Sequence, residues 1–182
     1  MGKLKPESII EFYAYIAKLK ELPRTGWVRR GVRNPESVAA HSYGVAVLSF
    51  MMASDAGADA GRALKLALVH DLAEALAGDI TPHDKAYKSK RQIEEDKLAE
   101  IVACLPLPMR QEIIALFAEL NAGKTAESGI VRTADKLDMA LMAKSYGKKI
   151  GNVDEFLDSA AEGISGCGRD IVEHLKGRFK RK

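Results

Sequence analysis

The stretch RALKLALVHDLAEALAGD, residues 62–79, has the apolar pattern of a buried helix but also carries a histidine and three carboxylates. Its Leu, Val and Ala residues recur at helical spacing, and Gly78 is a typical residue at a helix end, so we predict one continuous helix that stops there. In such a helix His70 and Glu74 share a face, which Asp71 borders. An unpaired carboxylate is costly to bury, so these groups must be neutralised, paired or bound to a metal ion.

Two interpretations of this segment are open. His70 could be a core histidine whose nitrogens are satisfied locally, with the acidic residues facing solvent. The adjacent Asp71, the second acid one turn later at Glu74, and Asp79 just beyond the helix favour a functional site.

Apolar periodicity and helix-ending residues predict helices along nearly the whole chain. The expected helices cover about residues 6–22, 35–56, 59–77, 88–104, 108–121 and 127–149, with two shorter ones in about 153–180. Residues 23–37 and 78–89 are rich in Gly, Pro and polar residues and are expected to be connections. No segment alternates as a strand does, so the sequence predicts an all-α fold with a single domain over residues 1–182.

Length and composition narrow the class of protein. The 182 residues are 47% hydrophobic, which suits one domain with a sizeable core. There is no run of about 18 apolar residues and no leader-like start, so we expect neither a membrane span nor secretion. Cys104 and Cys167 stand far apart, which fits a cytoplasmic setting. The net charge is only +3, with a basic excess in the tail KGRFKRK, so we expect no long nucleic acid as a partner.

A metal ion needs more ligands than one helical turn supplies, and two other apolar helices contain isolated polar residues. His41 lies in ESVAAHSYGVAVLSF, and Asp135 lies in VRTADKLDMALMA. Together with His70 and Asp71 they could form a His-His-Asp-Asp set, which suits a divalent ion such as manganese, cobalt, iron or zinc. Spacing alone does not choose Asp135 over Asp138, which lies one turn later.

The ordered motifs ESVAAHS, LVHDLAE, GDITP and TADKLD resemble the HD-domain superfamily of metal-dependent phosphohydrolases. Within it, LPRTGWVRRGV and HDLAEALAGDITP resemble the branch of 5′-deoxynucleotidases, which hydrolyse deoxynucleoside monophosphates. The resemblance covers about residues 6–150 and fades in the C-terminal helices at about 153–180. It implies an HD-type helical bundle and a homodimer, for which the C-terminal helices are a candidate interface.

The resemblance also implies roles for individual residues. The implied metal ligands are His41, His70, Asp71 and Asp135, around one divalent ion per chain that could also be magnesium. Glu74 corresponds to the acid that positions or activates water, and Asp79 to an acid beside the scissile phosphate and the sugar. The implied substrate-binding residues are Trp27, which packs on the nucleoside, Thr81 in the lining, and Arg24 or Arg30 at the phosphate.

Two positions depart from the pattern of this branch. Many relatives have an acidic residue just before the first metal histidine, where this chain has Ala40, so the group that orients His41 is open. Some members have an arginine directly before the tryptophan, where this chain has Gly26.

We therefore expect a metal-dependent phosphohydrolase that removes the 5′-phosphate from deoxynucleoside or ribonucleoside monophosphates. A carboxylate near the metal can orient or deprotonate water, and an arginine can neutralise the phosphate. The alternatives are a phosphodiesterase or nuclease on the same metal site, and a non-catalytic binding module that the metal stabilises. Glu74 and Asp79 argue against the last, because closing a four-ligand site needs neither.

Overall fold

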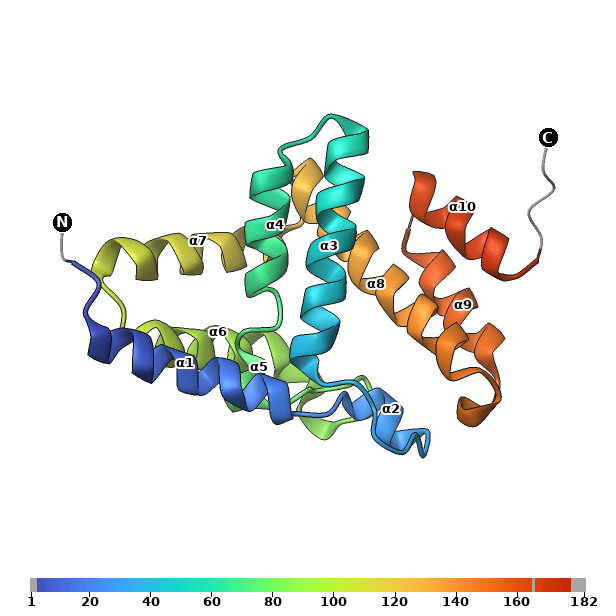
Figure 1. Cartoon of the computed structure of the whole chain (residues 1–182), viewed down its shortest axis with the longest axis horizontal. Coiled ribbons are helices and arrows are strands. Elements are labelled where there is room, and N and C mark those ends of the chain that lie inside the picture. The colour runs from blue at the N-terminus through green and yellow to red at the C-terminus, as the bar shows by residue number, and fades with distance from the viewer. Residues whose placement is uncertain (1–2, 165, 178–182) are drawn as a thin grey trace.

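The protein is described by a computed structural model that covers residues 3–164 and 166–177, and this part of the chain is helical without a named strand (Figure 1). The elements are α1 (Pro6–Glu21), α2 (Thr25–Arg29), α3 (Val38–Ala56), α4 (Ala60–Val69), α5 (Glu74–Ala77), η1 (Lys85–Ser89), α6 (Lys90–Val102), α7 (Leu107–Ala122), α8 (Ala126–Tyr146), η2 (Gly147–Ile150), α9 (Val153–Glu162) and α10 (Gly166–Leu175). The all-α prediction is confirmed. The end of the basic tail, residues 178–182, lies outside the described residues. Within the described ranges, no helix is both long and apolar enough to cross a membrane.

The centre of the fold is the α3–α4 hairpin packed against the long helix α8 (Figure 1). Their shared apolar cluster includes Val45, Leu66 and Val131, all of which are essentially buried. Burying such a side chain stabilises the fold by about 1.5–3 kcal/mol relative to leaving it exposed. This three-helix centre carries the polar residues that the sequence analysis singled out.

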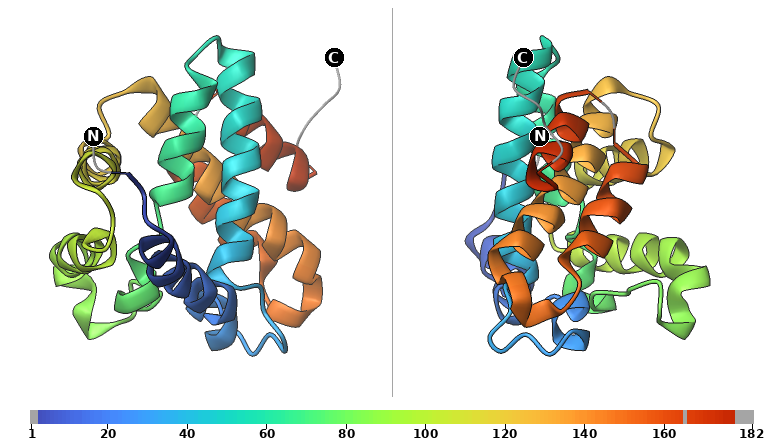
Figure 2. Two further views of the ribbon diagram at one scale, coloured as in Figure 1. Left: turned by 60° about the vertical axis from the view of Figure 1, so that its left-hand side comes forward. Right: turned by 90° about the vertical axis from the view of Figure 1, so that its right-hand side faces the viewer.

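Two groups of helices flank the centre (Figure 2). On one side α1, α5 and α6 enclose a second cluster, which includes Leu98 and Ile101, and α7 runs back beside α6. On the other side α9 and α10 pack against α8 around Leu157 and Val172. The two shorter C-terminal helices predicted from the sequence are thus present, and they extend the core formed by α8.

The prediction of one continuous helix over residues 59–77 is wrong in one respect. The chain leaves regular α-helical geometry where the functional residues lie. Helix α4 ends at Val69 and α5 begins at Glu74. Between them the amides of Leu72 and Glu74 donate to carbonyls three residues back, at Val69 and Asp71. These bonds are typical of a tighter 3₁₀-like turn, so His70 and Glu74 are not related by a regular α-helical face.

Smaller differences occur at the connections. Helix α3 starts at Val38 rather than near Pro35, because the Ser37 hydroxyl caps it by accepting from the amide of Ala40. The segment predicted as a connection contains the one-turn helix α2, and the second loop contains η1. The other long helices lie within a few residues of their predicted positions.

Candidate active site

The loop before α3 is fixed to the rest of the fold at its base. Pro23 and Ser37 form an isolated β-bridge, in which the amide of Arg24 donates to the Glu36 carbonyl and that of Val38 to the Leu22 carbonyl. The intervening loop is therefore closed on itself. It holds Arg24 and the α2 helix beside the start of α3, one turn before His41.

His41, His70 and Asp71 converge where α3, α4 and α8 meet. Their candidate ligand atoms all lie within 4.8 Å of one another. Asp135, on α8, completes the group, because its Oδ1 lies 3.1 Å from His41 Nε2. Asp71 Oδ2 lies 3.2 Å from His70 Nε2 and 3.7 Å from His41 Nε2. The structure thus brings together the four side chains expected to bind metal.

Each histidine ring is oriented through its other nitrogen. His70 Nδ1 lies 2.7 Å from the Ala67 carbonyl oxygen, which can only accept a hydrogen bond, so Nδ1 is protonated. His41 Nδ1 lies 2.7 Å from Asp138 Oδ2. Such contacts turn the Nε2 atoms of both rings toward the shared centre. Asp138 therefore supplies the acid that is missing at Ala40, which is itself exposed.

Gly44 makes the contact between His41 and Asp138 possible. A Cβ atom built on Gly44 would overlap Asp138 Oδ1 and lie 3.0 Å from its Cγ, inside normal contact distances. The Asp138 carboxylate therefore lies directly against the backbone of α3, one turn after His41. A side chain at this position would displace it.

The donor set fits a divalent metal ion. The Nε2 atoms of His41 and His70 are both buried, and neither makes a well-directed hydrogen bond. Buried polar atoms are normally paired, and two imidazole nitrogens facing two carboxylates are a ligand set of the kind that borderline divalent ions prefer. His41, His70, Asp71 and Asp135 would hold such an ion.

The ionisable groups in this cluster shift one another's pKa values. Burial alone would raise the pKa of Asp71, but His70, Arg24 and His41 outweigh it and hold this pKa well below its ordinary value. Burial would lower the pKa of His41, but its contacts with Asp135 and Asp138 raise it to about 10. Without a metal ion, the protonated His41 therefore supplies positive charge close to where the ion would lie.

Glu74 lies in a different environment, although it is only three residues from Asp71. Its side chain is 1% exposed, and burial followed by the neighbouring Asp71 and Asp79 raises its pKa. Lys90 Nζ lies 3.3 Å from Glu74 Oε1, whereas Oε2 is buried without a hydrogen-bond partner. Lys90 lies in the charged stretch SKRQIEEDK, residues 89–97, which has the composition of a solvated helix face, so the sequence gives no sign of this contact.

Asp79 and Arg24 connect the cluster to the loop around α2. The amide of Thr25 donates to Asp79 Oδ2 at 2.7 Å. Arg24 Nη1 lies 3.3 Å from Asp71 Oδ2 and 3.6 Å from Asp79 Oδ1, so the guanidinium lies between the two acids. Of the two candidate arginines, Arg24 is the one next to the metal-type cluster, which consists of His41, His70, Asp71 and Asp135.

A cavity of about 460 Å³ opens beside these groups and reaches across to the C-terminal helices. Its walls come from α2, the start of α5, the 79–83 loop, the start of α6, α8 and α9, and include Arg24, Asp71, Glu74, Asp79, Thr81, Lys90 and Asp135. The Thr81 side chain lines the cavity, but its hydroxyl already donates to Asp84 Oδ2 at 2.7 Å. A smaller cavity of about 190 Å³ reaches His70 and Asp135 from another direction.

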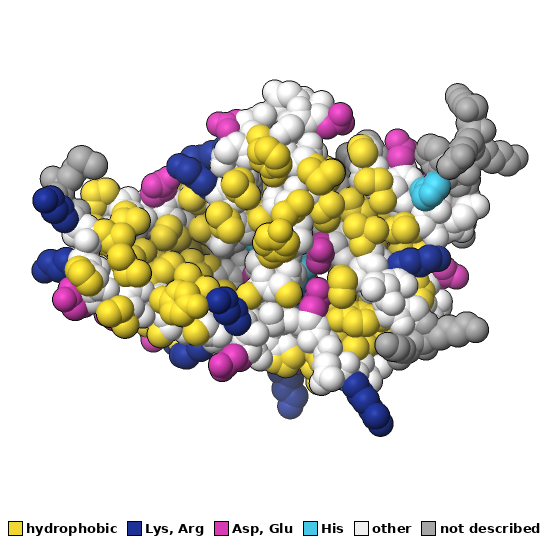
Figure 3. Space-filling view, in the orientation of Figure 1, with side chains coloured by type: hydrophobic (Ala, Val, Ile, Leu, Met, Phe, Trp, Pro, Cys, Tyr) yellow, Lys and Arg dark blue, Asp and Glu magenta, His cyan; other side chains and the backbone are white. Residues whose placement is uncertain are grey.

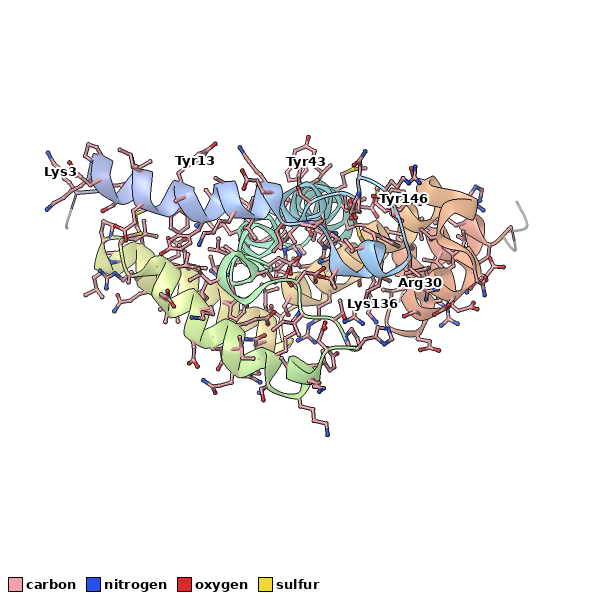
Figure 4. All side chains as sticks on the ribbon, turned by 90° about the horizontal axis from the view of Figure 1, so that it is seen from below. Lys3, Tyr13, Arg30, Tyr43, Lys136 and Tyr146 are labelled. Carbon is pink, nitrogen blue, oxygen red and sulfur yellow. The ribbon has the colours of Figure 1, made fainter. Side chains whose placement is uncertain are left out.

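Trp27 and Arg30 lie at the part of the cavity formed by α2 and α9. Trp27 is only 3% exposed, with its ring against Tyr146 and Phe156 and its Nε1 donating to Glu36 at 2.8 Å. Arg30 lies over the Phe156 ring, 5.0 Å from its centroid, and pairs with Glu155 at 2.7 Å. Figure 4 shows Arg30 beside the C-terminal helices.

Wall residues Glu155, Phe156 and Ser159 come from α9, beyond the segment that the sequence motifs cover. No motif marked them, because an amphipathic helix with one Phe and one Ser looks like any surface helix. Their place in the cavity follows only from the packing of α9 on α8.

A helical fold in which two histidines and two aspartates meet between three helices defines a class of helical proteins with a metal-type site. The family model described as HD domain matches residues 16–165, and the chain belongs to this family.

Named relatives resemble most of the chain. It is 39% identical to the 5′-deoxynucleotidase HDDC2 of Homo sapiens over 158 residues, which span 85% of this chain and 77% of the human protein. Among solved structures, a conserved hypothetical protein from Pyrococcus furiosus superposes with a TM-score of 0.77 at 34% identity, covering 92% of this chain and 99% of that one. A predicted metal-dependent phosphohydrolase from Magnetospirillum magnetotacticum superposes with a TM-score of 0.71 at 26% identity, covering 94% and 90%.

Proposed function

We propose that this protein is a metal-dependent hydrolase that removes the 5′-phosphate from deoxynucleoside monophosphates. The observation that carries the proposal is that one cavity is lined both by the two aspartates of the His-His-Asp-Asp cluster, Asp71 and Asp135, and by the buried Glu74, which is not part of that cluster. The similarity to the human 5′-deoxynucleotidase over most of both chains supports the same activity. We place the enzyme in the cytoplasm.

One divalent ion per chain is part of the proposal, held by His41, His70, Asp71 and Asp135. A bound ion would supply Lewis-acid stabilisation of the phosphate charge and activate the attacking water. Mixed imidazole and carboxylate ligands suit manganese, cobalt, iron or zinc, and magnesium is the harder alternative. Metal analysis of the protein purified without added metal would choose among them.

The remaining residues act on the substrate and on water. Glu74 has one oxygen held by Lys90 and the other unpartnered, so it can orient a water molecule or exchange a proton with it. Arg24, between Asp71 and Asp79, supplies the positive charge that neutralises phosphate oxygens. Asp79, tied to the Thr25 amide, is assigned to the side of the sugar.

The outer part of the cavity is assigned to the nucleoside. Phe156 and Met139 give this part apolar surface, the buried ring of Trp27 packs behind Phe156, and Thr81 lies on the opposite loop. Contacts with apolar and aromatic surface are tolerant of base identity, because every base has a π-face. We therefore expect broad use of deoxynucleoside 5′-monophosphates, and no preference for long nucleic acid.

We further propose a homodimer that uses the outer face of α1 and α3, in place of the C-terminal helices that the sequence analysis named as a candidate interface. Tyr43, Phe50 and Met51 on α3 are 73%, 52% and 59% exposed, and Ile10 on α1 is 72% exposed. Figure 3 shows hydrophobic side chains gathered over this side of the molecule, and in Figure 4 Tyr13 and Tyr43 project from it in the same direction. Contiguous apolar surface of this kind is typical of an interface. Light scattering at micromolar protein should give the mass of two chains, and Phe50→Glu should give one.

The activity is tested by phosphate release from a panel of nucleotides. The panel contains deoxynucleoside and ribonucleoside 5′-monophosphates, 3′-monophosphates, and bis-para-nitrophenyl phosphate as a diester. We expect release from the 5′-deoxynucleotides and little from the 3′-isomers or the diester. Cleavage of the diester alone would favour a phosphodiesterase, and a metal-loaded but inert protein would favour a binding module.

A further inference from the structure

Lys90 is the first residue of α6 and lines the cavity beside Glu74. Its Nζ lies 3.3 Å from Glu74 Oε1, 3.2 Å from Glu94 Oε1 and 3.1 Å from the carbonyl oxygen of Ile80. The Lys90 side chain is 28% exposed, less than those of Arg91 and Lys97 on the same helix, at 71% and 40%. Lys90 thus stands apart from the charged run in which it occurs.

Two hydrogen bonds, to Glu74 and Ile80, and an ion pair with Glu94 surround the Lys90 ammonium with protein oxygens. A lysine ammonium has three N–H donors, and two carboxylate oxygens and one carbonyl oxygen surround this one. A phosphate could be bound only by giving up one of these protein contacts. The geometry therefore favours a role toward the protein over a direct contact with substrate.

Two parts of the site are held by this one ammonium group. It fixes Oε1 of Glu74, whose Oε2 is buried and has no hydrogen-bond partner. It also fixes the carbonyl of Ile80, which lies between Asp79 and Thr81 in the cavity wall. The loop is also held by the Thr25 amide on Asp79 and by Asp84 on Thr81, whereas Lys90 is the only cation described in contact with the Glu74 carboxylate.

We propose that Lys90 is a positioning residue of the hydrolysis, which holds Glu74 by one oxygen and leaves the other free to act on water. The inference rests on the proposed function, since it assigns a role within that reaction. Misplacing a reacting group by about 1 Å can cost on the order of a hundredfold in rate, so a support of this kind is measurable.

The test is a double-mutant cycle on the metal-loaded protein, with the variants Lys90→Met, Glu74→Gln and the two combined. Lys97→Met is the matched control, because Lys97 lies on the same helix and pairs only with Glu100 among the contacts described. Metal content, thermal midpoint, kcat and KM for one deoxynucleoside 5′-monophosphate are measured for each.

We expect Lys90→Met to lower kcat by roughly ten- to a hundredfold with KM and metal content nearly unchanged. In the Glu74→Gln background the same substitution should change kcat by no more than about threefold, because residues that act through one another are not additive. Lys97→Met should behave like the wild-type protein. A rise in KM with kcat preserved, or an equal fold loss in both backgrounds, would overturn the proposal.

The thermal midpoints give a readout that needs no substrate. Lys90→Met should lower the midpoint, because a buried carboxylate loses its cation, and should lower it clearly less once Glu74 is Gln. Equal shifts in both backgrounds would contradict the coupling. If the wild-type protein released no phosphate from any nucleotide, the proposed function would fail, and the thermal cycle would still decide whether Lys90 acts on Glu74.

Discussion

Two sides of the candidate active site bury their acidic residues in different surroundings. On the histidine side, formed by His41, His70, Asp71 and Asp135, imidazoles and Arg24 surround the carboxylates and keep the pKa of Asp71 low. On the glutamate side, Glu74 has one lysine at 3.3 Å and two acidic neighbours, and its pKa is raised. Asp71 and Glu74 are three residues apart, so their difference comes from what faces them.

The comparison indicates a division of labour. A carboxylate that stays ionised among imidazoles is suited to hold a cation. A carboxylate whose ionisation is costly, with one oxygen unpartnered, is suited to exchange a proton. Variants that affect one side alone can separate these roles.

The largest effect is expected on the histidine side. His70→Ala removes one ligand and should abolish both metal binding and phosphate release, because the remaining three ligands leave the site incomplete. Elemental analysis and a phosphate-release assay measure the two effects. His174→Ala, on the remote helix α10, is the control. Unchanged metal content in His70→Ala would disprove the ligand assignment.

The glutamate side should respond in turnover without metal loss. Glu74→Gln keeps the size of the side chain and removes its ability to accept a proton, so kcat should fall by roughly a hundredfold or more. Metal content measured on the same sample should equal that of the wild-type protein. Activity within a few-fold of wild type would mean that Glu74 has no such role.

Disturbing the contact between Asp138 and His41 should give an intermediate effect. Gly44→Ala places a methyl group where Asp138 contacts His41, and we expect metal affinity to fall roughly ten- to a hundredfold, as when second-sphere partners of metal ligands are removed. Asp138→Asn should act in the same direction. Gly129→Ala, an exposed helical glycine with no atom within 4 Å of an added Cβ, should leave affinity unchanged. Equal affinities for Gly44→Ala and wild type would refute the role of this contact.

The smallest expected effect is the release of protons when the histidine side binds a metal ion. The pKa of His41 is raised to about 10 without metal, so this ring is protonated at pH 7 and must lose its proton before Nε2 can bind an ion. Metal uptake should therefore release protons, and affinity should rise with pH up to about 10. Calorimetry in buffers of different ionisation enthalpy measures the release. A value of zero near pH 7 would contradict it.

The sequence predicted the helices better than the geometry of the site. His41, His70 and Asp71 were recognisable because polar residues interrupt apolar helices, whereas the choice of Asp135 over Asp138 came only from the resemblance to HD-domain phosphohydrolases; the structure brings the four side chains together. The turn between α4 and α5 was not predictable, since Leu, Ala and Glu are good helix formers in either geometry. Lys90 and Phe156 were missed for another reason: their neighbours in space, Glu74 and Trp27, lie far away in sequence.

The packing of α9 separates the shape of the cavity wall from the geometry of the reactive centre, two properties that often change together in enzymes. Phe156 and Ser159 line the cavity from a helix anchored around Leu157 and Ala160, in a cluster distinct from the one beneath the metal ligands. Changes on the cavity face of α9 can therefore reshape the pocket while the reactive centre stays intact. The cavity thus combines a reactive half with a separately anchored wall, and directed evolution of new substrate preferences has a natural starting point at Phe156 and Ser159.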